Sequence, residues 1–210
     1  MAHYLTKLRE LKNKPGFSIK VKKYNNKSIV LRVLTYEDLK NRTVIQNLSD
    51  WREKHSFWFG GGFKVTNART RKWLKDLVLD KDDRILFMIE DQEGNSWGHL
   101  GFNRFDPKDN SCELDNVVRG TSGISGLMTD CVEAIVKWGF GNLKIENMYL
   151  STYLDNKKAI ALYKRCGFVQ IGKVPLKRIR RDGELVWVEA EKESKTGARR
   201  YFAKFKFKGN

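Results

Sequence analysis

Long hydrophobic runs, cysteine pairs and proline are scarce in this sequence. Its longest strongly apolar run, residues 85–89, is far shorter than the ~20 residues that a membrane-spanning helix needs. The first ten residues interrupt their apolar positions with charge, unlike a signal or transit peptide. With 3 Pro, 17 Gly and 12% aromatic residues in 210, the chain is neither collagen-like nor disordered. We therefore expect a soluble globular protein with no membrane partner.

Cysteine provides no pattern of cross-links. Cys112, Cys131 and Cys166 are an odd number and include no Cys-x-x-Cys pair, which argues against a disulfide framework and against a zinc site. Each lies in an apolar context, where a buried small hydrophobe is favoured over a nucleophile. We expect no metal and a reducing, cytoplasmic compartment.

The positive charge is concentrated at the two ends of the chain. The net charge is +16 overall, of which residues 1–27 and 173–210 carry +7 each and residues 28–172 only +2. Two interpretations stay open. The basic ends either keep the protein in solution or attract an anionic partner such as a nucleotide, a nucleic acid or an acidic surface.

Hydrophobic periodicity predicts one mixed α/β (α+β) domain. Helices are expected at residues 1–12, 36–47, 66–79, after Gly126 and at 156–166. Strands are expected at 17–24, 28–35, 84–91, 97–104, 111–118, 146–153 and 168–176, followed by a hairpin of 185–188 with 201–207. The predicted core is 28–176, with a central, mostly antiparallel sheet flanked by helices. Residues 1–27 form a basic N-terminal extension, and 177–210 form a basic C-terminal hairpin extension packed on the core.

Residues 51–64 combine aromatic side chains with a glycine triplet. Trp51, Phe57, Trp58 and Phe59 precede three glycines and Phe63, a pattern that fits no regular element. A packed surface loop is one interpretation. A mobile lid that lays Trp58 and Phe59 over a substrate is the one that we favour, because a glycine triplet costs order without filling a core.

A Gly/Ser-rich stretch, residues 119–126, lies between a predicted strand and a predicted helix. Unpaired N–H groups and the positive end of a helix dipole hold a phosphate there without a side-chain base. The stretch matches neither the P-loop nor the dinucleotide-binding glycine pattern. A merely flexible loop is the alternative.

A second motif is more specific, and it carries a family resemblance. Residues 156–168 closely resemble the second signature block of the GNAT family of N-acetyltransferases through Asn156, Ala159, Leu162, Tyr163, Gly167 and Phe168. The resemblance covers 84–172 well and 28–50 loosely. It is greatest to the branch that acetylates ribosomal-protein N-termini and amino sugars, with 117–120 and 126–129 as the most similar stretches.

The resemblance implies acetyl-CoA as co-substrate and assigns residues to it. The backbone of Val117 and Val118 would pair with the pantetheine arm, and Asn156 would contact that arm. Tyr163 would protonate the leaving thiolate. The phosphate loop has no clean register, so its N–H groups are expected within the set Arg119, Gly120, Gly123, Ile124, Ser125 and Gly126.

Acetyl transfer to an amine also needs a deprotonated nucleophile. Glu113 and Asp115 alternate onto one face of a predicted strand, and His99 lies on the preceding strand. Glu113 is the first choice of base, by its resemblance to the acidic residue of relatives, and His99 is a candidate substrate contact. Ordinary exposed carboxylates, a structural histidine, a Tyr163 that only packs, and proton transfer to water are the alternatives.

Together these observations predict an N-acetyltransferase that moves an acetyl group from acetyl-CoA to a primary amine by direct attack. The favoured acceptor is a small molecule, in particular an anionic, nucleotide-linked amino sugar, since aromatic rings stack on sugars and bases. A ribosomal-protein N-terminus is one alternative. A non-catalytic module that binds polyanions or nucleic acid on the same fold is another. A homodimer is left open.

Overall fold

The computed structural model describes residues 3–24, 27–60, 64–181, 184–190 and 200–209. These residues form one sheet of nine strands in the order β1-β2-β3-β4-β5-β6-β9-β7-β8. Every described pairing is antiparallel except that of β5 with β6. The strands are β1 (Ser18–Tyr24), β2 (Lys27–Val33), β3 (Ile85–Asp91), β4 (Ser96–Asp106), β5 (Ser111–Arg119), β6 (Asn147–Tyr153), β7 (Phe168–Arg181), β8 (Glu184–Glu189) and β9 (Arg200–Phe207).

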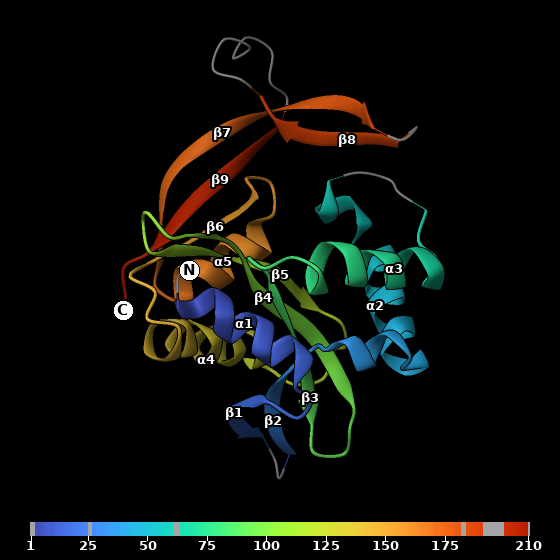
Figure 1. Ribbon diagram of the computed structural model, residues 1–210. Coiled ribbons are helices and arrows are strands. Elements are labelled where there is room, and N and C mark those ends of the chain that lie inside the picture. The colour runs from blue at the N-terminus through green and yellow to red at the C-terminus, as the bar shows by residue number, and fades with distance from the viewer. Residues whose placement is uncertain (1–2, 25–26, 61–63, 182–183, 191–199, 210) are drawn as a thin grey trace.

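Helices cover both faces of this sheet, but unequally (Figure 1). We call the two sides the α4 face and the α2 face. The α4 face carries α1 (His3–Asn13), α4 (Leu127–Asn142) and α5 (Lys157–Arg165). The α2 face carries η1 (Tyr36–Leu39), α2 (Arg42–Lys54), η2 (Ser56–Phe59), α3 (Asn67–Leu74) and η3 (Lys75–Leu79). The second group lies over the middle of the sheet, where it packs on Leu86 and Met88 of β3 and on Val118 of β5 (Figure 1).

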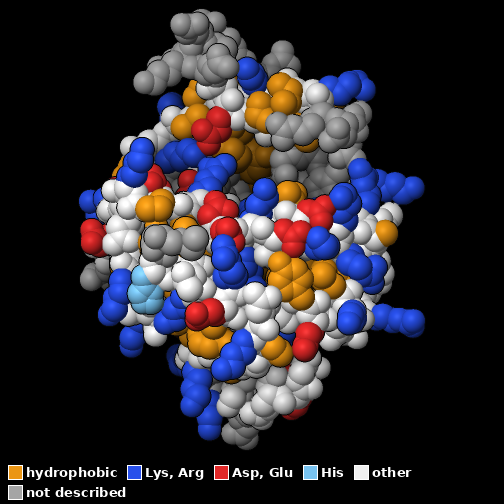
Figure 2. Space-filling view, in the orientation of Figure 1, with side chains coloured by type: hydrophobic (Ala, Val, Ile, Leu, Met, Phe, Trp, Pro, Cys, Tyr) orange, Lys and Arg blue, Asp and Glu red, His pale blue; other side chains and the backbone are white. Residues whose placement is uncertain are grey.

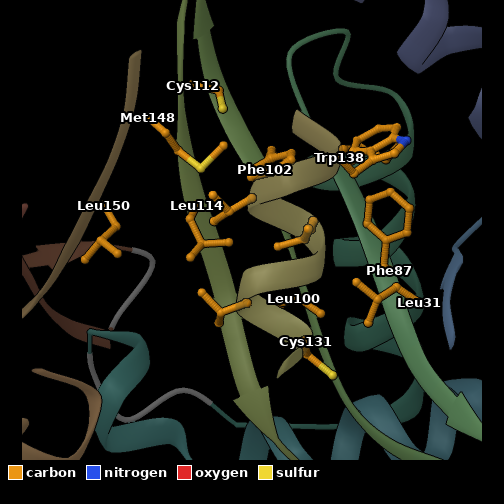
Figure 3. Close-up of a cluster of buried hydrophobic side chains, with 14 of the residues drawn as sticks. Leu31, Phe87, Leu100, Phe102, Cys112, Leu114, Cys131, Trp138, Met148 and Leu150 are labelled. Atoms are coloured by element: carbon orange, nitrogen blue, oxygen red, sulfur yellow. The ribbon is translucent and has the colours of Figure 1, made fainter. Parts of the chain in front are cut away.

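The main core lies under the α4 face. Alternate residues of the central strands, among them Phe87 and Phe102, point to this side and are at most 1% exposed. They pack on Trp138 of α4, with ring centroids 5.4 and 6.3 Å away (Figure 3). A second cluster holds α2 and α3 on the opposite face through Leu48, Leu74 and Met88. Hydrophobic burial on both sides fixes the register of the sheet.

The predicted fold class is confirmed, and most of the predicted elements are present. One correction concerns the helix expected at 36–47. It is a short 3₁₀ turn, η1, followed by a helix that starts six residues later than expected and runs to Lys54. The side chain of Asn41 caps that helix by accepting a hydrogen bond from the Val44 amide at 3.2 Å.

The aromatic stretch 51–64 is more regular than expected. Trp51 belongs to α2 and is buried, and Phe57, Trp58 and Phe59 form η2. The glycine triplet is residues 60–62. Its last two glycines and Phe63 lie outside the described residues. The lid hypothesis therefore stays a prediction, whereas the expectation of a wholly irregular segment is wrong.

The C-terminal hairpin is also a correction. β8 pairs with β7, whereas β9 pairs with both β6 and β7 and so lies inside the sheet. Phe205 of β9 is fully buried in the main core. The predicted hairpin of 185–188 with 201–207 is therefore wrong, and residues beyond 177 supply an interior strand of the sheet.

Candidate active site

A cleft opens where β5 and β6 stop pairing. Their parallel ladder ends at Glu113 with Tyr149, although both strands continue. Beyond that point the cleft has a volume of about 850 Å³ and is lined by β5, the first turn of α4, β6, α5, η2 and β8. Figure 2 shows a hollow on this side of the molecule, with hydrophobic side chains inside it and charged side chains along its rim.

A β-bulge in β5 lies just beyond the point where β5 and β6 stop pairing, beside the cleft. Gly101 pairs with Asp115 and His99 with Val118, so that Asn116 and Val117 together oppose one residue of β4. Asn116 has a φ of 52°, a conformation that asparagine tolerates better than most residues. A bulge leaves residues out of the ladder. Asn116 and Val117 therefore fall outside the ladder at this bulge, and both residues line the cleft.

The predicted phosphate loop leads into the first turn of α4. Gly126 stands at the N-cap with a φ of 77°, the left-handed region that favours glycine. The Thr129 amide donates to the Gly126 carbonyl at 2.9 Å, so that the N–H groups of Leu127 and Met128 are the ones that a first turn leaves without a partner in the helix. The cleft lining includes residues 126–129. Of the predicted loop residues, Arg119, Gly120 and Gly126 line the cleft. Gly123, Ile124 and Ser125 do not.

Arg119 and Gly120 stabilise this loop. The guanidinium of Arg119 donates hydrogen bonds to the carbonyls of Thr121, at 3.4 Å, and Ile124, at 3.3 Å. A Cβ at Gly120 would lie 2.0 Å from the ring of Trp51. Only glycine therefore lets the chain turn against α2 at this position.

Asn156 and Tyr163 contribute from α5. Asn156 is the N-cap, and its Oδ1 accepts a hydrogen bond from the Ala159 amide at 3.2 Å. Its Nδ2 is the group that the cap does not use. Tyr163 lines the cleft about two helical turns later. Burial, and then the charge of Asp115, raise the pKa of Tyr163 above its ordinary value. The hydroxyl therefore stays protonated at neutral pH.

Both predicted carboxylates line the cleft, and each is ion-paired. Glu113 lies 3.3 Å from the guanidinium of Arg104. The Oδ2 atom of Asp115 accepts hydrogen bonds from Arg84 at 2.6 Å, Asn103 at 3.0 Å and Asn116 at 2.6 Å. All three described donors bind Oδ2, which leaves Oδ1 for a ligand. Asp115 also contributes to the raised pKa of Tyr163, whereas Glu113 does not.

Aromatic rings form the far wall of the cleft. Trp58 and Phe59 of η2 line it, together with Tyr153, Trp187 and Phe202. A substrate contact at Trp58 and Phe59 stays a prediction. The amide of Trp187 donates a hydrogen bond to the Gly60 carbonyl at 2.8 Å. This bond joins β8 to the end of η2. It connects the helices of the α2 face with the C-terminal strands of the sheet.

His99 does not reach the cleft. It is fully buried on β4, with its ring centroid 6.0 Å from that of Trp51. Burial lowers its pKa to about 3, so the imidazole is neutral at ordinary pH. The interpretation as a substrate contact is therefore corrected, and His99 is a structural histidine beneath the β5 bulge.

Several residues that line the cleft were not predicted from the sequence. Asn103 Oδ1 and Ser151 Oγ are buried without a hydrogen-bond partner among the described residues, and both side chains line the cleft. Unpaired buried polar atoms are rare and point to a ligand. Period-two alternation around Glu113 could have placed Asn103 on the same face. The contributions of Tyr153 and Trp187 depend on long-range pairing, for which the sequence carries no local signal.

Other functional classes find little support in the described residues. All three cysteines are buried. Burial raises the pKa of each thiol, that of Cys166 to about 11, which suppresses the reactive thiolate. No group of three or more His, Cys, Asp or Glu side chains suited to a metal is present among these residues. Nor is any of their helices long and apolar enough to cross a membrane.

Comparison with known proteins places this geometry in a family. Residues 28–169 match the family model described as Acetyltransferase (GNAT) domain. A spermidine N(1)-acetyltransferase of Vibrio cholerae serotype O1 is 25% identical over 147 residues, which are 70% of this chain and 82% of that protein.

Solved structures share the fold at low sequence identity. A spermidine N-acetyltransferase from Vibrio cholerae, crystallised in complex with CoA and spermine, has a TM-score of 0.63 and 19% identity, covering 85% of this chain and 94% of that one. A probable acetyltransferase (GNAT family) from Chromobacterium violaceum has a TM-score of 0.66 and 14% identity, covering 93% and 89%.

Proposed function

Because this chain belongs to the GNAT acetyltransferase family and is an N-acetyltransferase with acetyl-CoA as co-substrate, we propose that it acetylates a small primary amine whose remainder is neutral or anionic. A nucleotide-linked amino sugar is the favoured acceptor. The observation that carries this choice is the pairing of every acidic side chain described along the cleft. Family membership also favours an enzyme over a non-catalytic nucleic-acid-binding module.

Acetyl-CoA fits the half of the cleft built from β5, α4 and α5. The first turn of α4 behind Gly126 offers N–H groups and a positive dipole end to the pyrophosphate. The bulge at Asn116 and Val117 offers polar backbone groups to the pantetheine arm and the carbonyl. Asn156 contributes its Nδ2 at the same wall. Bound there, acetyl-CoA supplies an activated acetyl group as a thioester.

Asp115, in place of the first choice Glu113, is the carboxylate that we propose to hold the acceptor amine. Its charge acts on Tyr163, and an amine that attacks the acetyl carbon must lie near the acid that protonates the departing sulfur. Oδ1 of Asp115, with Asn103 Oδ1 and Ser151 Oγ, offers acceptors to the ammonium group before attack. The amine proton then leaves to Asp115 or to water.

Tyr163 completes the reaction at the other side of the carbonyl. As the C–N bond forms and the C–S bond breaks, the sulfur gains negative charge. The protonated hydroxyl of Tyr163 donates to that sulfur. A backbone N–H freed by the bulge stabilises the charge that develops on the carbonyl oxygen.

The charges of the cleft disfavour a polycationic acceptor. Glu113 pairs with Arg104, Asp115 with Arg84, and Glu189 with Lys204 at 2.6 Å. Four further cationic side chains line the same cleft, namely Lys54, Arg119, Lys158 and Arg165. A primary amine attached to phosphate or sugar fits these surroundings better than a chain with several ammonium groups.

A polyamine is the second candidate, because the similar proteins from Vibrio cholerae are spermidine acetyltransferases. The acidic and aromatic side chains of the cleft are compatible with one end of such a molecule. A ribosomal-protein N-terminus has no comparable observation in its favour. The cytoplasmic location, the homodimer and the division into 1–27, 28–176 and 177–210 stay predictions.

The test measures CoA release with matched acceptors at one ionic strength. The acceptors are a nucleotide-linked amino sugar, the free amino sugar, spermidine and a peptide with a free N-terminus. We expect the highest kcat/KM for the nucleotide-linked amine. A higher value for spermidine would overturn the anionic acceptor and leave the transferase intact. Absence of any thermal shift with acetyl-CoA would contradict the cofactor site itself.

A further inference from the structure

Arg200 of β9 is enclosed by four aromatic rings. Its guanidinium carbon lies 3.5 Å from the ring centroid of Tyr153, 4.4 Å from that of Phe57, 5.6 Å from that of Trp58 and 5.8 Å from that of Trp187. The rings come from η2, β6 and β8, three elements far apart in the sequence. We call these four side chains the aromatic cage.

Arg200 is buried and forms an ion pair in this position. The residue is 8% exposed, and its Nε lies 3.2 Å from Oδ2 of Asp155, a carboxylate that is half-exposed. Cations bind aromatic faces more strongly when water is excluded. A cage of several rings with an adjacent carboxylate is also how proteins recognise ammonium ligands. The aromatic cage is therefore a cation site that the chain fills with its own side chain.

The cage forms part of the acceptor side of the cleft. Trp58, Tyr153 and Trp187 line the cleft, and Arg200 lies against the same three rings. Arg200 and Phe202 are two residues apart on β9 and so lie on the same face of that strand. The ring of Phe202 is 4.7 Å from that of Tyr153. An acceptor that occupies this wall meets aromatic rings whose cation site is already taken.

We propose that Arg200 determines acceptor specificity by occupying the cation position of the aromatic cage. An acceptor with a second ammonium group finds neither a free aromatic site nor an unpaired carboxylate at Asp155, and the guanidinium repels it. An acceptor whose reacting amine is its sole cation loses nothing. This inference rests on the proposed function, in that the acceptor lies against this wall.

The first experiment probes the cage without catalysis. Tetramethylammonium is titrated into Arg200→Ala and the unmodified protein while tryptophan fluorescence is recorded, since Trp58 and Trp187 belong to the cage. We expect saturable quenching in the variant and none in the unmodified protein, with methylguanidinium competing for the same site. Equal responses in the two proteins would overturn the proposal.

The second experiment compares acceptors. In Arg200→Ala the ratio of kcat/KM for spermidine to that for an anionic primary amine should rise about 30-fold, the size of one desolvated cation–π contact. Arg178→Ala is the matched control. Its guanidinium also lies over the Trp187 ring, at 5.2 Å, but the side chain is exposed and outside the cage. The control should leave the ratio unchanged, and an equal rise in both variants would contradict a role specific to Arg200.

A third variant keeps the proposal testable if removal of the side chain unfolds the sheet. Arg200→Gln retains length and a planar end but no charge, and it should raise the same ratio while its thermal midpoint stays near that of the unmodified protein. An unchanged ratio in a folded Arg200→Gln would refute the specificity role. A normal thermal shift with acetyl-CoA in that variant would show that the transferase assignment survives such a failure.

Discussion

The two halves of the cleft are built in different ways. The cofactor half uses mainly backbone: a bulge at Asn116, a helix N-terminus behind Gly126 and a capping residue, Asn156. The acceptor half uses side chains brought together from β4, β5, η2, β6, β8 and β9. Backbone recognition tolerates changes in most side chains, whereas side-chain recognition changes with single substitutions. We therefore expect cofactor binding to tolerate most substitutions and acceptor specificity to change with single ones.

Tyr163→Phe should have the largest effect, because Tyr163 serves the junction between the halves. Removal of a general acid lowers kcat by about 100-fold or more, while the phenyl ring keeps its packing against Phe168. Steady-state CoA release measures kcat, and the thermal shift with acetyl-CoA measures binding, which should persist. Tyr201→Phe is the control, because Tyr201 is not among the described residues that line the cleft. A kcat within threefold of the unmodified protein would remove Tyr163 from the chemistry.

Asp115→Asn and Glu113→Gln separate two carboxylates of the acceptor half. Because Asp115 lies by the reacting groups, its substitution should lower kcat/KM for the amine by about 30-fold, the size of a lost charged hydrogen bond. Glu113, paired with the exposed Arg104, should cost less than threefold. Initial rates at low amine concentration give both values. The reverse order would restore Glu113 as the principal carboxylate.

The pH dependence of stability tests whether water is excluded from His99, beneath the β5 bulge. Its pKa of about 3 lies below the ordinary value of 6.5. The unfolded chain therefore binds a proton between these values that the native chain does not. The stabilisation is present above pH 6.5 and should fall by about 1.4 kcal/mol for each pH unit below it.

His99→Leu should flatten this acid limb when unfolding is followed between pH 7.5 and 5. His55→Ala is the control at a half-buried histidine. Parallel curves for His99→Leu and the unmodified protein would show that the site is hydrated.

Two asparagine caps give the smallest effect and the closest comparison. Asn41 caps α2 and Asn156 caps α5, each accepting from a backbone amide at 3.2 Å. Each substitution by Ala should lower the free energy of unfolding by about 1 kcal/mol. Asn156→Ala should also raise the Kd for acetyl-CoA several-fold, whereas Asn41→Ala should not. Equal affinities in a calorimetric titration would limit Asn156 to capping.

The cofactor half was more accessible from the sequence, because its signals are local. The glycines near residue 126 lie within the unit of β5 and α4, and the motif at Asn156 and Tyr163 lies within the unit of β6 and α5. The structure places these side chains along one cleft. The loop register was less accessible, because a φ of 77° at Gly126 against 132° at Gly123 follows from packing, not from composition.

The acceptor half could not be derived in the same way. The order of β9 between β6 and β7 depends on burial of Phe205, and any of several apolar strands satisfies the same alternation. Without that order, the approach of Arg200 to Tyr153 has no signal. His99 illustrates the opposite error. A histidine on a strand next to a functional strand was interpreted chemically, although its alternation equally allowed full burial.

The position of β9 has a consequence for synthesis of the chain on the ribosome. β6 and β7 are neighbours in sequence order but are held apart by a strand made after both. Until residues 200–207 emerge, the two strands lack their shared partner, and their hydrogen-bonding edges and apolar faces stay exposed. The cofactor half can assemble during translation, but the acceptor half closes last. A nascent chain should therefore acquire affinity for CoA before it acquires any preference among amines.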